Sequence, residues 1–144
     1  MKILALETSS KQQSLATISD GCVVSEFKEE SERPSSNLFL HIKALLAQST
    51  WQLKDVDAFA FSGGPGSLTG LRIGAMAAIG MAISQNKPLV KMCSLKALAL
   101  QALESSTAKV VGTIVNAHMN EVHFALFRVL SGEGIICEIA HRVL

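Results

Sequence analysis

Charged side chains are scarce in this sequence. They make up 17% of its 144 residues, whereas hydrophobic residues make up 49% and the mean hydropathy is +0.35. This composition excludes a disordered chain and provides for a core of fair size, but leaves little charge to cover the surface. We therefore expect some apolar surface to belong to an interface. The net charge of +1 gives no electrostatic footprint for tight binding of tRNA or DNA by this chain alone.

Cysteine is also scarce. Cys22, Cys93 and Cys137 are far apart in the sequence and form no CxxC pair. This spacing favours buried, reduced thiols over a disulfide framework or a zinc site. The chain starts with a single lysine, Lys2, and a short apolar run before Glu7, which is not the pattern of a signal peptide. No apolar run reaches the length of a membrane-spanning helix, so we expect a cytoplasmic protein.

Apolar periodicity and turn signals predict an alternating series of strands and helices. The predicted strands cover residues 3–6, 14–18, 22–27, 58–61, 89–92, 110–115, 122–130 and 135–139. The predicted helices cover residues 34–49, 67–84 and 94–104, the last of them capped by Ser94. Between the third strand and the first helix, residues 28–33 are predicted to be a charged loop.

This order of elements is β-β-β-α-β-α-β-α, followed by β-β-β. The first eight elements match an α/β fold, the ribonuclease-H-like half of the actin, Hsp70 and sugar-kinase architecture, in which helices flank a mixed five-stranded sheet. The last three strands resemble the start of a second such domain. We therefore predict a first domain over residues 1–105 and an incomplete second domain over residues 106–144.

The most distinctive stretch is the glycine-rich segment from Ser62 to Gly74, between a predicted strand and a predicted helix. It matches none of three standard motifs: no lysine follows as in a P-loop, the Rossmann glycine spacing fails at Thr69, and the nucleophile elbow GxSxG fails around Ser67. Two interpretations remain open. The segment is a tight strand-to-helix turn, or it binds an anion at the helix N-terminus.

The helix after this segment has no polar side chain from Ile73 to Ile83. A helix on the outside of a sheet is normally polar on one side, so a second face of this helix must also be covered. Small residues form one stripe, which would let another helix approach closely: Gly70, Gly74, Ala77 and Ala78. A second stripe is formed by Arg72, Met76, Ile79 and Ile83. Either a partner chain covers the helix, which we favour, or the rest of this chain does.

Three segments together resemble the bacterial TsaB family, also called YeaZ. They are Ile-Leu-Ala-Leu-Glu-Thr-Ser at 3–9, Gly-Pro-Gly-Ser-Leu-Thr-Gly-Leu-Arg-Ile-Gly at 64–74, and Asn-Ala-His-Met-Asn-Glu-Val at 116–122. The second segment is the most specific. In the third, Asn116 and His118 stand where the family has Asp and Arg.

The resemblance implies a non-catalytic paralogue of TsaD, the enzyme that attaches threonylcarbamoyl to adenosine 37 of tRNA, in the M22 glycoprotease-like family. It implies a heterodimer with TsaD, a TsaE-like ATPase as a further partner, a homodimer in isolation, and contact with tRNA only through the complex. No catalytic residue, metal or cofactor is implied. The implied interface residues are Leu38, Ile42, Leu45, Ser67, Thr69, Gly70, Arg72, Ile73, Gly74, Met76, Ala77 and Gly80.

Two other functions are weighed against this scaffold role. An actin-like ATPase or small-molecule kinase would use Glu7, Thr8 and Ser9 as a first phosphate loop, which the resemblance makes at most vestigial. Such an enzyme also needs a magnesium carboxylate and a base, which the sequence does not identify. A metalloprotease would need a helical His-x-x-x-His pair, and none of the four histidines has that spacing.

Overall fold

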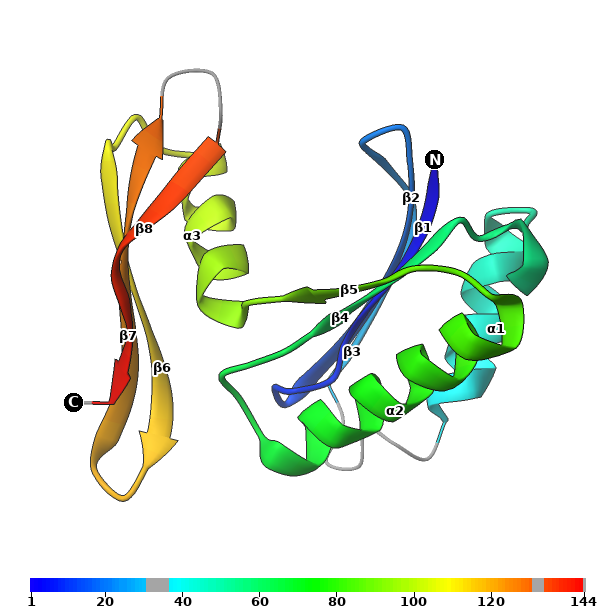
Figure 1. Cartoon of the computed structure of the whole chain (residues 1–144), viewed down its shortest axis with the longest axis horizontal. Coiled ribbons are helices and arrows are strands. Elements are labelled where there is room, and N and C mark those ends of the chain that lie inside the picture. The colour runs from blue at the N-terminus through cyan, green and yellow to red at the C-terminus, as the bar shows by residue number, and fades with distance from the viewer. Residues whose placement is uncertain (31–36, 131–133, 144) are drawn as a thin grey trace. The chain divides into compact units, whose positions relative to one another are not determined.

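The computed structural model describes residues 1–30, 37–130 and 134–143. Within it the chain forms two compact units, which we describe one at a time (Figure 1). The first unit contains Met1–Gly63 and Ser67–Lys91, and the second contains Gly64–Gly66 and the chain from Met92 onward. The glycine-rich segment therefore contributes residues to both units.

The described residues of the first unit form five strands, two α-helices and one short 3₁₀ helix. These are β1 (Lys2–Glu7), β2 (Gln12–Ser19), β3 (Cys22–Glu30), α1 (Leu38–Gln48), η1 (Leu53–Asp55), β4 (Ala58–Ser62), α2 (Leu68–Gln85) and β5 (Leu89–Met92). The second unit contains α3 (Ser94–Glu104), β6 (Val110–His118), β7 (Glu121–Leu130) and β8 (Gly134–Val143). Each predicted strand and helix has a counterpart in this series.

The sheet of the first unit has the order β3-β2-β1-β4-β5. Strand β1 pairs antiparallel with β2 and parallel with β4, so the sheet is mixed. Leu4 on β1 lies opposite Thr17 on one side and Phe59 on the other. With two helices after the meander, this topology is the ribonuclease-H-like fold of the actin and sugar-kinase architecture. The predicted fold class is confirmed.

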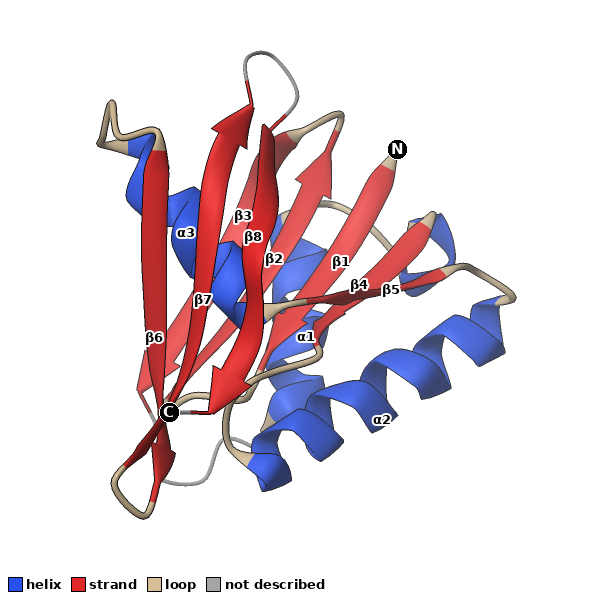
Figure 2. Ribbon diagram, turned by 60° about the vertical axis from the view of Figure 1, so that its left-hand side comes forward, coloured by secondary structure: helices blue, strands red, loops and turns tan. Residues whose placement is uncertain are grey.

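Helices α1 and α2 both cover one face of this sheet (Figure 2). Alternation along β1 sends Leu4 and Leu6 to that face, where they are fully or almost fully buried. Phe59 on β4 reaches the same layer and is also fully buried. From the helices, Leu45 and Met81 complete the cluster. The core of the first unit therefore lies between the two helices and the central strands.

In the second unit, β6, β7 and β8 form an antiparallel meander that packs against α3. Leu95 and Ala99 of the helix are fully buried in a cluster with Ala125, Phe127 and Ile135. The backbone N–H of Ser94, at the start of α3, donates to the carbonyl of Gly64 at 2.8 Å. The structure thus groups α3 with the second sheet, whereas our domain boundary places this helix in the first domain.

Several local expectations differ from the structure. Strand β3 continues to Glu30, so the part of the predicted charged loop up to that residue is strand. Cys93, not Ser94, is the N-cap of α3. The three cysteines, expected to be buried, are all exposed: Cys22, Cys93 and Cys137. The predicted start of the first helix at residues 34–36 lies outside the described residues, and α1 begins after Asn37.

Candidate protein-interaction surface

The turn after β1 is in direct contact with the first turn of α2. The Thr8 hydroxyl donates a hydrogen bond of 2.7 Å to the carbonyl oxygen of Gly70, and both groups are buried. The backbone N–H of Ser67, the N-cap of α2, donates to the carbonyl of Ser9 at 2.7 Å. The Ser67 side chain in turn accepts from the Gly70 N–H. The glycine-rich segment thus places the start of α2 directly on the end of β1.

Two glycines make this close approach sterically feasible. A Cβ atom on Gly70 would lie less than 3.0 Å from the backbone carbonyl of Thr8, a separation that real Cβ atoms do not show. A Cβ on Gly74 would meet the Thr8 hydroxyl at a similarly impossible distance. The face of α2 that carries these glycines is therefore buried. It includes Ala77, Ala78, Met81 and Ala82 further along the helix.

This burial corrects our expectation that the small-residue stripe is open to another protein. The stripe is instead the face by which α2 packs on its own unit. The opposite face, which we call the outer face of α2, carries the large side chains. It consists of Leu68, Arg72, Met76, Ile79, Gly80 and Ile83. Met76 and Ile83 are 73% and 76% exposed, and Ile79 is 41% exposed.

Helix α1 also places its predicted interface residues in the core. Leu38, Ile42 and Leu45 are at most 4% exposed and belong to the core cluster of the first unit. They are not available to a partner while this unit is folded. The large apolar residues of α1 that are exposed are Phe39 and Leu40, which were not among the predicted interface residues.

The other predicted interface residues lie on both sides of α2. Thr69, Arg72, Met76 and Gly80 are exposed. Ile73 is half-buried and packs against the core, and Ser67 is exposed at the N-cap. Ile79 and Ile83 were assigned to one helical stripe with Arg72 and Met76, but they were left out of the predicted interface residues. That stripe was visible in the sequence, but its exposure was not.

A family model described as "TsaD: tRNA N6-adenosine threonylcarbamoyltransferase" matches residues 3–140. The chain belongs to this family. Within the family, its relatives include the TsaB proteins of Haemophilus influenzae, 37% identical over 126 residues, and Escherichia coli, 31% identical over 128 residues. Both are named tRNA threonylcarbamoyladenosine biosynthesis protein TsaB. The predicted resemblance to TsaB is confirmed.

These alignments cover 87% and 89% of this chain but 53% and 55% of the two relatives. The chain therefore spans about half the length of the curated TsaB proteins it matches. A crystal structure described as an uncharacterized protein with similarity to peptidase YEAZ from Pseudomonas aeruginosa superposes with a TM-score of 0.91 at 29% identity. The superposition covers 99% of this chain and 66% of the chain in that crystal structure.

In this TsaB-type chain, the polar groups of the possible phosphate loop are engaged internally. The Thr8 hydroxyl bonds to Gly70, and Glu7 accepts a hydrogen bond from the backbone N–H of Ser9. The Ser9 hydroxyl lies 3.5 Å from that of Ser62, and the Ser9 carbonyl accepts from Ser67. The turn therefore serves as a docking point for α2.

The described ranges contain no cluster of three or more His, Cys, Asp or Glu side chains with the geometry of a metal site. In the same ranges, no helix combines the length and apolar character needed to cross a membrane. The most distinctive feature of the described residues is instead a surface of exposed apolar side chains. That surface is the outer face of α2.

Proposed function

We propose that this chain is a non-catalytic partner subunit that binds a TsaD-type enzyme and supports threonylcarbamoylation of adenosine 37 in tRNA. The names of its TsaB relatives support the pathway, because they are described as proteins of tRNA threonylcarbamoyladenosine biosynthesis. The match to the TsaD family model supports a paralogous enzyme as the partner. A TsaE-like ATPase would join this pair, and tRNA would contact the chain only within the complex.

The observation that carries this proposal is the outer face of α2. Three large aliphatic side chains, Met76, Ile79 and Ile83, lie exposed on a helix whose only charged residue is Arg72. Fully burying one such side chain contributes about 1.5–3 kcal/mol, so covering this face would favour association strongly. Phe39 and Leu40 of α1 add exposed apolar surface on the second helix. In isolation, the same face would pair two copies of the chain.

The alternative function, an actin-like ATPase or kinase, is disfavoured by the turn after β1. Phosphate binding uses free backbone N–H groups and hydroxyls. Here the Thr8 hydroxyl and the Ser67 N–H donate to carbonyl oxygens of the chain itself. We expect no ATP hydrolysis and no tight tRNA binding by the purified chain at physiological salt. Turnover that is lost on substitution of Glu7 would favour the alternative.

Co-purification with the TsaD-type enzyme of the same organism tests the proposal. We expect the unsubstituted chain to form a complex and to raise threonylcarbamoylation of tRNA by that enzyme. Met76→Glu should abolish both, because it places a charge in the centre of the apolar face. Val23→Glu on the edge strand β3, where Val23 is 59% exposed, is the matched control. It should leave both the complex and the increase in threonylcarbamoylation intact.

Two results would contradict the proposal. One is the absence of any complex between the enzyme and the folded chain. The other is loss of the complex with Val23→Glu to the same extent as with Met76→Glu, since it would show that any added surface charge is sufficient. Size-exclusion chromatography of the chain alone, with the same two variants, separately tests self-pairing through this face.

A further inference from the structure

We infer that Thr8 is a positioning residue for the partner surface, because its contacts with Gly70 and Gly74 fix which face α2 presents outward. This inference rests on the proposed function and adds to it a residue that does not touch the partner. Thr8 is only 2% exposed, so it acts through α2.

The contact has two parts that constrain α2 together. The hydroxyl of Thr8 donates to the Gly70 carbonyl at 2.7 Å, which sets where the helix begins relative to β1. The Thr8 carbonyl and hydroxyl also occupy the space that Cβ atoms on Gly70 and Gly74 would need. These two glycines are four residues apart and so lie on one side of the helix. A helix turned about its axis would bring residues with side chains into this space.

Because α2 is rigid, a contact that fixes its rotation on one side also fixes the direction of the side chains on its outer face. Successive residues are turned by about 100° about the axis, so Met76 lies about 200° from Gly74, on the far side of α2. Ile79 and Ile83 continue the stripe of Met76 at spacings of three and four residues. The Thr8 contact therefore holds these three side chains in one fixed orientation before any partner binds. A surface that is already ordered loses less conformational entropy on binding.

The Ser67–Ser9 hydrogen bond supports the same assignment. It joins the N-cap of α2 to the residue after Thr8 at 2.7 Å. This bond is between backbone groups and so fixes the helix end whatever side chain stands at position 8. Rotation of α2 about this fixed end is then limited by the Thr8 side chain. Substitution of Thr8 tests that contribution separately.

The test compares Thr8→Val with Thr8→Ser. Valine keeps the shape of the side chain but removes the donor, whereas serine keeps the donor. Binding to the TsaD-type enzyme of the same organism is measured by titration calorimetry, and urea unfolding followed by Trp51 fluorescence confirms that each variant is folded. We expect Thr8→Val to weaken binding about three- to tenfold, the effect of one lost hydrogen bond. Thr8→Ser should bind within about twofold of the unsubstituted chain.

A core variant separates positioning from plain stability. Leu15 is buried on β2, the strand that packs under α1, and Leu15→Val removes core volume without altering the contacts of Thr8 with Gly70 and Gly74. We expect this variant to lose stability in urea and to keep its affinity for the enzyme. Equal weakening by Leu15→Val and Thr8→Val would overturn the inference, and so would a folded Thr8→Val chain with unchanged affinity.

A second variant applies if Thr8→Val does not fold. Gly74→Ala leaves position 8 unchanged and places a Cβ against the Thr8 hydroxyl, so it should weaken binding to the enzyme. A folded Gly74→Ala chain with unchanged affinity would overturn the inference. Failure of the unsubstituted chain to bind the enzyme would overturn the proposed function and this inference with it. That result is distinguishable, because it appears before any substitution is made.

Discussion

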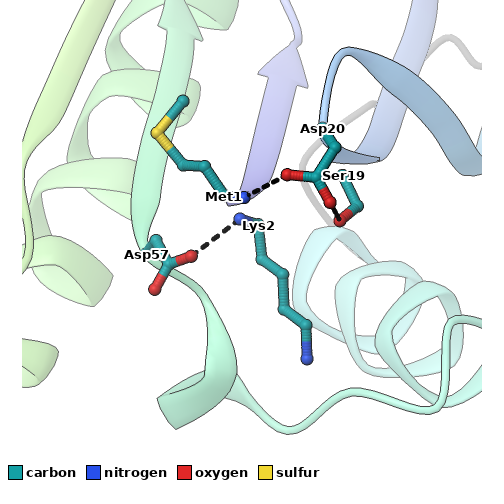
Figure 3. Close-up of polar contacts among 5 residues, drawn as sticks. All are labelled: Met1, Lys2, Ser19, Asp20 and Asp57. Atoms are coloured by element: carbon teal, nitrogen blue, oxygen red, sulfur yellow. Dashed lines mark hydrogen bonds and ion pairs between the residues drawn. The ribbon is translucent and has the colours of Figure 1, made fainter.

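The two ends of strand β1 are held in opposite ways. At its start, exposed carboxylates hold the chain (Figure 3): the Met1 amino group lies 2.6 Å from Asp20 Oδ1, and the Lys2 backbone N–H donates to Asp57 Oδ2 at 2.8 Å. At its other end, the buried Thr8 hydroxyl and the Ser9 carbonyl contact the first turn of α2. The contacts at the first end are exposed and involve charged groups, whereas the contacts with α2 at the second end are made by uncharged groups, and the one from Thr8 is buried.

This difference indicates where the unit can tolerate change. Water and salt replace or screen exposed charged contacts, so each contributes little to stability. The buried end depends on shape, because the space beside Thr8 excludes any side chain at two positions of α2. We therefore expect the buried end to determine the position of the proposed partner surface. The exposed end should adjust stability only slightly.

The largest effect should come from adding one methyl group at the buried end. Gly70→Ala places a Cβ against the Thr8 backbone carbonyl, which cannot rotate away as a side chain could. Overpacking of this kind costs about 1–3 kcal/mol of unfolding free energy. Urea unfolding followed by fluorescence of Trp51, the only tryptophan, reports on the first unit, because this residue packs against its core.

The matched control is Gly80→Ala on the same helix. A Cβ there meets nothing within 4 Å, so the variant should gain up to about 1 kcal/mol from the better helix propensity of alanine. Equal stability changes for Gly70→Ala and Gly80→Ala would contradict the shape argument. They would mean that the end of β1 moves to accommodate the new methyl group.

Most of the fold could be predicted from the sequence, because it depends on local patterns. Alternating apolar residues identify the strands, and turn residues such as Asp20-Gly21 separate them. Strand β3 was predicted too short because its last residues are charged, although edge strands commonly carry charged residues. The grouping of α3 was missed because its cover, around Phe127, follows more than twenty residues later in the chain.

The orientation of α2 could not be predicted, because it depends on a contact between residues 62 positions apart. Its sequence shows a small-residue stripe and a large-residue stripe, and either could face the sheet. The Thr8 hydroxyl selects the small one. For α1, the apolar spacing was correct, but Leu38, Ile42 and Leu45 face the core rather than a partner. Glycines four residues apart, close to a strand end, are the signal that could have indicated this docking.

An intermediate effect is expected at the exposed end of β1. Asp57→Ala removes the acceptor for the Lys2 N–H and the partner that Lys87 approaches at 4.0 Å. Water can replace both, so the loss of unfolding free energy should be about 0.5–1 kcal/mol. Asp57→Asn keeps an uncharged acceptor and should lose less. A larger loss than that of Gly70→Ala would reverse the ranking of the two ends.

The smallest effect should be the pH dependence of the pair between Met1 and Asp20. The hydrogen bond that the terminal amine donates to Asp20 raises the pKa of this amine above 8.0. The same bond, with a second one donated by Ser19, lowers the pKa of Asp20 below 3.8. The stabilisation is therefore complete between these two ordinary values. It is lost as the pH rises through the raised amine pKa, and as the pH falls through the lowered carboxyl pKa.

Asp20→Asn should be slightly less stable than the unsubstituted chain near neutral pH and equally stable in strong alkali. The comparison requires urea unfolding of both chains across this range at low and high salt. A difference that persists after the amine has lost its proton would show that Asp20 acts through Ser19 and not through the terminal charge.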